Sequence, residues 1–299
     1  MNRAKANLLL LLAGAVWGMG FVAQSTAMDA VGPMLFVSLR FALATLAVLP
    51  FALHEAGRAA DPLPAADWSG FVWIGIALFG GMAFQQVGLT TTTVTNAGFL
   101  TGLYVVLVPL LLVVVLRQAP HPIVWPAALL AFAGIWLLSG GSFLAMNRGD
   151  VLVIISAVFF ACQVILIGVF GGRTGRPLTL SAVQFAICAV LGFAAAVATE
   201  PIDWHAIRDA APEIVYSGVF STGLAFSLQA IGQRYTTSAQ AAIFLSSEAL
   251  FAALFGAVFL GERIAGYGFL GCFFIFAAIL AVEIIPATRG RRATGEKAR

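Results

Sequence analysis

Apolar runs of membrane-spanning length fill nearly the whole chain, and they constrain its fold more than any short motif does. A helix that crosses about 30 Å of hydrocarbon needs roughly 20 residues, and the sequence offers about ten such runs between short polar or Pro/Gly-rich links. With 61% hydrophobic and 10% charged residues among 299, the chain is too apolar for an ordinary soluble domain. We therefore predict an all-α integral membrane protein with about ten transmembrane helices.

The second half of the chain repeats the first. Gly81-Met82-Ala83-Phe84 returns 142 residues later as Gly223-Leu224-Ala225-Phe226, and Asn96-Ala97-Gly98 returns 144 residues later as Gln240-Ala241-Ala242, with two residues gained in the connecting turn. Each half holds five predicted crossings, and an odd number gives the second copy the opposite orientation in the membrane. The predicted fold is two inverted five-helix repeats, which place a binding site near the midplane where the halves meet.

A repeat boundary is expected near Met146. Residues 1–146 form the first predicted repeat, residues 147–288 the second, and residues 289–299 a basic cytoplasmic tail. The first run is of span length and matches the start of the second repeat, so we expect a helix there and not a cleaved signal peptide. Pro109, inside the fourth span, is a candidate kink or hinge. The predicted spans are about 8–26, 32–53, 68–89, 94–116 and 123–140, then 149–170, 177–199, 212–232, 237–260 and 266–285.

Lys and Arg are distributed unevenly between the two sides of the predicted bundle. If both termini are cytoplasmic, twelve of the sixteen lie in inner loops and tails. Only Arg148, Arg208 and Arg263 then lie outside, and Arg40 falls within a span. Basic residues accumulate on the cytoplasmic side of membrane proteins, so the pattern predicts a multi-pass protein with both termini in the cytoplasm. The formal charge of +3 is spread over loop ends and the tail, which gives no nucleic-acid surface.

A polar and aromatic face lies on the first predicted helix, where Trp17, Phe21 and Gln24 are spaced i, i+4 and i+7. At an offset of 142, Trp17 and Phe21 correspond to Phe159 and Gln163. An aromatic stripe in a membrane helix is usually packing, but an unpaired amide is costly in hydrocarbon and favours an inward-facing site. Both interpretations stay open at this point.

A second face of this kind lies on the ninth predicted span, and its polar ends align with those of the fourth span. The four residues are Gln240, Phe244, Ser247 and Glu248, and Asn96 and Tyr104 match the first and last of them. We predict a hydrated cavity between these faces, to which Gln85 and Ser227 contribute from the preceding helices. The alternative is helix–helix hydrogen bonding, worth under about 2 kcal/mol per contact.

Two charged residues fall inside predicted spans. Glu248 is the acidic residue deepest within a span. We predict either that its protonation is linked to transport or that its carboxylate binds a substrate ammonium group. Arg40 lies seven residues past Pro33, about 10 Å along a helix from the boundary. A charge at this depth either snorkels outward or pairs internally, and its partner cannot be identified from the sequence.

The sequence contains no constellation typical of an enzyme. The three histidines lie at loops or span ends, and there is no Walker lysine, no HExxH and no intramembrane Asp pair. The three cysteines lie in apolar runs without CxxC spacing, so neither a disulfide framework nor a zinc site is predicted. We expect no enzyme activity, no cofactor, no metal and no nucleic-acid partner. The expected partners are a small-molecule substrate and membrane lipid. We expect a monomer, and a dimer stays open as the alternative.

Short motifs in order along the chain resemble the drug/metabolite transporter superfamily, specifically its ten-helix EamA-type exporters. They are Leu260-Gly261-Glu262-Arg263 followed by Gly271, Leu39-Arg40-Phe41 in the second span, and Asn96-Ala97-Gly98-Phe99 at the start of the fourth. The resemblance covers nearly the whole chain in both halves. The chain departs from the pattern at Ser247-Glu248-Ala249, where the family often has Leu-Glu-Pro.

This resemblance implies export of small metabolites, often amino acids, across the bacterial inner (plasma) membrane by alternating access. The chain is most similar to exporters of aromatic and other neutral amino acids. The alternatives are a lipophilic-cation or drug exporter and a membrane scaffold that transports nothing. The expected substrate-binding residues, with Glu248 also as the coupling candidate, are Trp17, Phe21, Gln24, Phe84, Gln85, Asn96, Tyr104, Phe159, Gln163, Ser227, Gln240, Phe244, Ser247 and Glu248.

Overall fold

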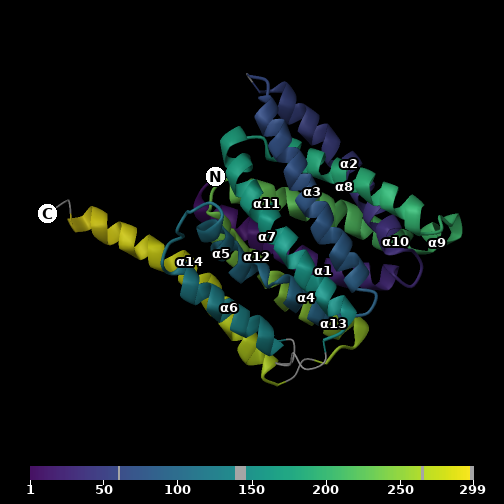
Figure 1. The fold of residues 1–299 in the computed structure, drawn as a ribbon. Helices are drawn as coiled ribbons and strands as arrows, with labels where there is room; N and C mark the ends of the chain where they lie inside the picture. Colours follow the sequence, from purple (N-terminus) through teal and green to yellow (C-terminus); the bar gives the residue numbers. More distant parts are fainter. Residues whose placement is uncertain (60, 139–145, 264–265, 297–299) are drawn as a thin grey trace.

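The computed structural model describes residues 1–59, 61–138, 146–263 and 266–296, and within these ranges the chain is helical and contains no strand. Nine helical stretches are long and apolar enough to cross a membrane, which confirms the predicted all-α membrane fold. The fifth predicted span, 123–140, is represented by the shorter helix α6 (Val124–Leu138), and residues 139–145 lie outside the described ranges. Figure 1 shows the helices packed as one bundle.

The helices of the first repeat are followed by their counterparts in the second, in the same order. In the first they are α1 (Arg3–Ala27), α2 (Pro33–Gly57), α3 (Ala65–Gly88), α4 (Val94–Thr101), α5 (Tyr104–Val114) and α6. In the second they are α7 (Arg148–Thr174), α8 (Pro177–Thr199), α10 (Ala211–Val215), η1 (Tyr216–Leu224), α11 (Ala225–Gln233), α12 (Ser238–Leu245), α13 (Ser247–Leu260) and α14 (Gly268–Glu296), with the short α9 (Trp204–Asp209) in a loop.

The bundle has two ends, which we name by the chain termini. The terminal face is the end where α1 begins and α14 passes Glu283, and the opposite face is the end where α1 finishes and α4 begins. Helices α2 and α8 begin with prolines, Pro33 and Pro177, which suit the first turn because its N–H groups have no intrahelical partner. These two prolines lie 144 residues apart at opposite faces, as expected of inverted repeats.

The equivalent helices α2 and α8 lie side by side and cap each other. The Glu200 carboxylate accepts hydrogen bonds from the N–H groups of Met34 and Leu35, both at 2.8 Å. At the terminal face the Glu55 carboxylate accepts from the N–H groups of Leu178 and Thr179, at 3.2 and 2.7 Å. A carboxylate satisfies the free N–H groups of a helix start and is favoured by the helix dipole. The pair is therefore clamped at both faces.

The fourth and ninth predicted spans are each divided into two helices. The first break, between α4 and α5, lies at Gly102-Leu103 and precedes Pro109, which sits inside α5. The second, between α12 and α13, lies at Ser246. Hydrogen bonds of the i to i+3 type tighten both breaks, from Leu103 N–H to Leu100 O and from Ala249 N–H to Ser246 O. The structure thus divides both predicted spans, and the break in the fourth lies at Gly102-Leu103 and not at Pro109, the candidate kink or hinge.

The fifth helices of the two repeats, α6 and α14, form a pair at one edge of the bundle (Figure 1). They approach closely at Gly134, where an added Cβ would lie 2.6 Å from the Gly271 carbonyl oxygen. Helix α14 continues to Glu296, past the predicted end of the last span at residue 285. The other helices form the central part of the bundle.

Candidate functional site

A buried cavity lies between the two repeats. Every residue that lines it is at most 9% exposed. Its volume is about 30 Å³, enough for about two water molecules. The cavity therefore has to widen before it can hold a solute. The lining residues are Trp17, Phe21, Gln24, Arg40, Met82, Gln85, Thr101, Tyr104, Phe160, Gln163, Val164, Ser221, Phe226, Gln229, Leu245 and Glu248.

Half of the residues expected to bind substrate line this cavity, and half lie elsewhere. The structure brings together Trp17, Phe21, Gln24, Gln85, Tyr104, Gln163 and Glu248. The residues placed outside the lining are Phe84, Asn96, Phe159, Ser227, Gln240, Phe244 and Ser247. Phe84 and Phe159 stack on each other with ring centroids 5.7 Å apart, which is the packing alternative for an aromatic stripe.

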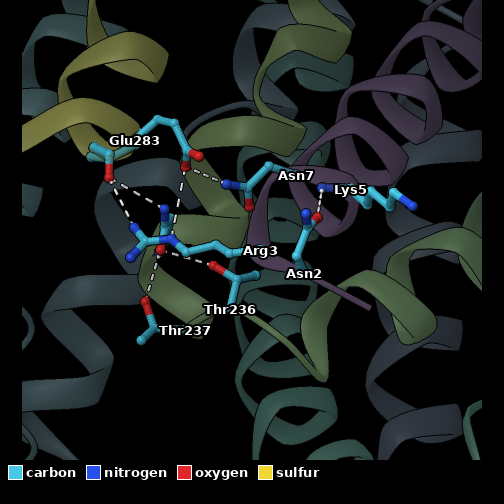
Figure 2. Close-up of polar contacts among 9 residues, drawn as sticks. Asn2, Arg3, Lys5, Asn7, Thr236, Thr237 and Glu283 are labelled. Carbon is cyan, nitrogen blue, oxygen red and sulfur yellow. Dashed lines mark hydrogen bonds and ion pairs between the residues drawn. The ribbon is translucent and has the colours of Figure 1, made fainter. Parts of the chain in front are cut away.

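The other outlying residues are occupied by local contacts. The Ser227 hydroxyl donates to the Gly223 carbonyl of its own helix, at 2.6 Å. Gln240 lies near the terminal face, where it accepts from the Thr236 hydroxyl and donates to the Val282 carbonyl. Figure 2 shows this region, where Arg3 and Asn7 of α1 meet Glu283 of α14 close to Thr236 and Thr237. Asn96 lies in the first turn of α4, Ser247 beside Gly14, and Phe244 in the apolar core.

Pairs of lining residues lie 144 positions apart and reveal how the repeats correspond. Met82 pairs with Phe226, and Gln85 pairs with Gln229. The sequence match of Gly81–Phe84 to Gly223–Phe226, at an offset of 142, instead paired Gln85 with Ser227 and so missed Gln229. The longer offset also relates Pro33 to Pro177 at the starts of α2 and α8, so it already applies before η1 begins.

The breaks in the two divided helices position Tyr104 and Glu248 at the cavity. Tyr104 is the first residue of α5 and Glu248 the second of α13. The Tyr104 hydroxyl lies beside the Glu248 carboxyl, and Glu248 Oε1 is buried without a hydrogen-bond partner. The partial positive charge of the α13 N-terminus favours an anion at this place. Discontinuous helices whose ends point at a midplane site are typical of transporters with inverted repeats.

The π-helix η1 supplies polar groups to the other side of the cavity. The Trp17 indole N–H donates to the Ser221 carbonyl at 2.9 Å. Arg40 donates from Nε to the Thr222 hydroxyl at 2.9 Å and from Nη2 to the Ser221 hydroxyl at 3.3 Å. π-Helical turns are rare and occur often at functional sites.

Arg40 is 1% exposed, so of the two alternatives for a charge inside a span, outward snorkelling is wrong. Its guanidinium carbon lies 5.7 Å from the Phe36 ring centre and 5.5 Å from that of Phe41. Its Nη1 atom is buried and has no hydrogen-bond partner. The sequence identified Arg40 as unusual, but its contacts with η1 depend on helix packing.

Buried amides continue the polar lining. Gln163 donates to Gln184 at 3.2 Å and to Gln229 at 3.3 Å, and Gln229 donates back to Gln163 at 3.1 Å. Gln24 Oε1 and Gln184 Nε2 are buried without partners. A buried cavity with unused donors and acceptors suits a solute that carries polar groups.

The comparisons with known proteins agree with this architecture. The model of the EamA-like transporter family matches residues 4–140 and again residues 147–284. The chain belongs to the EamA-like transporter family. It is 34% identical to an uncharacterized transporter of Archaeoglobus fulgidus over 95% of this chain and 87% of that protein. It is 25% identical to the uncharacterized transporter YwfM of Bacillus subtilis over 94% of each chain.

The fold of this EamA-family transporter also occurs in a solved crystal structure. That structure superposes with a TM-score of 0.78 over 96% of this chain and 99% of the other, at 20% identity. The two family matches cover the two halves of the chain, so the internal duplication holds at the level of the family. The protein is thus a multi-pass membrane transporter built from two repeats.

The hydrogen bonds that join the two divided helices differ between the two faces of the transporter. At the opposite face the Glu262 carboxylate accepts from the N–H groups of Val94 and Thr95, at 2.9 and 3.0 Å, and from the Thr95 hydroxyl. We call these three residues the Glu262 latch. It joins the loop after α13 to the start of α4, so the two divided helices are held together at this face.

The counterpart of the latch at the terminal face is not closed. Gln118 follows α5 as Glu262 follows α13, and the N–H groups of both donate to the carbonyl six residues earlier. The preceding residues, Arg117 and Gly261, both have positive φ, 53° and 69°. Within the described ranges, however, the Gln118 side chain makes no hydrogen bond to α12, and a groove of about 590 Å³ runs between residues 118–124 and 236–240.

Proposed function

We propose that this EamA-family protein is a secondary transporter that exports small metabolites, above all aromatic and other neutral amino acids, across the bacterial inner membrane. Alternating access carries the solute through the cavity between the repeats, and both termini lie in the cytoplasm. The observation that supports this most is the buried cavity at the seam of two repeats, lined by one carboxyl, several amides and a group of aromatic rings.

The chemistry of the lining fits the two ends of such a solute. Trp17 and Phe226 lie with ring centroids 4.6 Å apart, and with Phe21 and Phe160 they form an apolar wall for a side chain. Glu248, which has an unused carboxyl oxygen, can receive an ammonium group. Glu248 is also the candidate for coupling to a proton, since it lies inside the membrane and borders the transport path.

The asymmetry between the two faces supports alternating access. The Glu262 latch joins the start of α4 to the loop after α13 at the opposite face, and the equivalent position at the terminal face borders a groove. In the alternate state we expect Gln118 to approach the start of α12 while Val94 and Thr95 leave Glu262. The clamped pair α2 and α8 stays fixed, because it is capped at both faces.

A lipophilic-cation exporter is the second candidate, and Glu248 favours it. The buried guanidinium of Arg40 in the same cavity opposes it, because like charges at close range in a low dielectric repel. A scaffold without transport is the remaining alternative.

Counterflow with purified protein in lipid vesicles tests the proposal. Vesicles loaded with unlabelled L-phenylalanine should accumulate labelled L-phenylalanine, and a panel of unlabelled amino acids should rank the specificity. Glu248→Gln should abolish or strongly reduce this flux. Glu283→Gln is the matched control, because this carboxyl lies at the terminal face and contacts Asn7 and Arg3 outside the cavity. Absence of flux for every amino acid and every cation tested would favour a scaffold.

A further inference from the structure

The cavity contains a cation, Arg40, that forms no ion pair with any described acidic residue. Two ion pairs occur among the described residues, Arg3 with Glu283 and Arg173 with Asp67, and neither includes Arg40. The protein partners of the Arg40 guanidinium are the neutral hydroxyls of Thr222 and Ser221. Arg40 is nevertheless buried at 1% exposure, well inside α2.

A buried charge without a counter-ion is costly, and the local contacts of Arg40 reduce this cost only in part. Two hydroxyls accept from Nε and Nη2, and the rings of Phe36 and Phe41 face the cation. Nη1 remains buried without an acceptor. A guanidinium presents its N–H groups as a planar fork that matches a carboxylate, so the unused nitrogen is suited to one.

An opposite charge lies in the same cavity and is also incompletely used. Glu248 lines the cavity, its Oε1 has no hydrogen-bond partner, and it forms no ion pair with Arg40 within the described structure. Two opposite groups that border one space without contacting each other are complementary to a solute that carries both charges. A singly charged amine would satisfy Glu248 and leave Arg40 unpaired.

We propose that Arg40 binds the carboxylate of a zwitterionic substrate, while Glu248 faces its ammonium group. This rests on the proposed function and deepens it, because it defines the substrate class as one that needs both charges. The aromatic wall then tolerates different apolar side chains, and the two charged ends set the specificity. If Arg40 served only to hold η1 against α2, the substrate carboxylate would not matter.

Four probes that share one aromatic ring separate these readings. L-phenylalanine carries both charges, L-phenylalaninamide and phenethylamine lack the carboxylate, and 3-phenylpropionate lacks the ammonium. Binding is measured as the ligand-dependent thermal shift of the purified protein, and flux is measured as counterflow in vesicles. We expect each of the three analogues to bind at least about 30-fold more weakly than L-phenylalanine, because each leaves one buried charge unpaired.

Variants of Arg40 and its neighbours test whether Arg40 distinguishes L-phenylalanine from the analogues that lack the carboxylate. In Arg40→Gln the affinity ratio of L-phenylalanine to L-phenylalaninamide should fall to within about threefold of one, since L-phenylalanine loses the carboxylate contact that the amide never makes. Thr222→Val removes one anchor of Arg40 and should lower the ratio in a protein that keeps the charge, which covers the case in which Arg40→Gln does not fold. Arg173→Gln is the matched control outside the cavity and should keep the wild-type ratio.

Each outcome decides a separate point. Equal affinity of the wild-type protein for the amino acid and the amine, with flux of both, overturns the role of Arg40 and leaves transport standing. Weaker binding of the analogues without flux of any probe supports the role of Arg40 in carboxylate recognition and overturns the proposed transport. A ratio that survives in Arg40→Gln assigns recognition to another group, and binding of none of the four probes overturns both proposals.

Discussion

The Glu262 latch gives the sharpest test of how the two faces open. Glu262→Gln keeps the shape of the side chain and one carbonyl oxygen, so one of the two backbone N–H groups, of Val94 or Thr95, can still be bonded. The change removes one charge-assisted hydrogen bond and the attraction between the carboxylate and the α4 helix start, each worth about 1 kcal/mol. The closed state should lose about 2 kcal/mol relative to a state with the opposite face open, which corresponds to about a 30-fold shift in population.

Reagent access to the cavity measures this shift. A cysteine at Gln24, which lines the cavity, is introduced into a protein in which Cys162, Cys188 and Cys272 are replaced by alanine. A membrane-impermeant thiol reagent is then applied to each side of the membrane in vesicles of known orientation. Glu262→Gln should raise the modification rate about 30-fold from the side of the opposite face and leave the rate from the terminal side unchanged or lower.

Glu200→Gln is the matched control, because it removes the same type of cap from α2 at the same face. Helix α2 remains clamped to α8 at the terminal face by Glu55, so the access of the reagent should not change. The reasoning is refuted if Glu262→Gln leaves the rate within threefold of wild type, or raises it equally from both sides. A parallel measurement of the unfolding midpoint separates opening from general loss of stability.

Three further results are expected. Gln118→Glu places a carboxylate at the position equivalent to Glu262, so it should cap α12 and close the terminal face. Reagent access to the cavity from that side should become about tenfold slower, and Gln118→Ala should leave the access rate unchanged. Glu248→Gln should remove any dependence of the transport rate on pH if this carboxyl carries the coupled proton, and a variant that keeps both full rate and unchanged pH dependence excludes both roles of Glu248. Trp17→Phe leaves the Ser221 carbonyl without its indole donor and should lower the free energy of unfolding by about 1–3 kcal/mol, compared by thermal denaturation with Phe84→Leu, which alters a ring pair outside the cavity.

The membrane fold could be predicted from the sequence because each part of it depends on local composition. Runs of about 20 apolar residues exclude other folds, since the bilayer forces every backbone polar group into a helix. The duplication was visible in residue identities, and the family match to both halves agrees with it. On the first helix, the helical spacing grouped Trp17, Phe21 and Gln24, and the structure places all three in the cavity lining.

The rest of the site depends on how the helices pack. Helical spacing defines one face of one helix, so it could not distinguish Phe84, which stacks on Phe159, from Phe226, which lines the cavity. It could not locate the helix breaks at Gly102-Leu103 and Ser246, because neither position carries a proline. Gln229 was missed because the match of Gly81–Phe84 to Gly223–Phe226 set an offset of 142 residues, whereas Gln85 and Gln229 of the lining are 144 apart.

By itself, the sequence determined that this chain forms membrane helices in two related halves and that Arg40 and Glu248 lie inside the bilayer. Only the tertiary structure decided that the two charges border one buried cavity and that the Glu262 latch joins α4 to the loop after α13 at one face. The physical reason is that hydrophobicity is read along one helix, whereas a cavity and its access are formed by side chains from several helices distant in the chain.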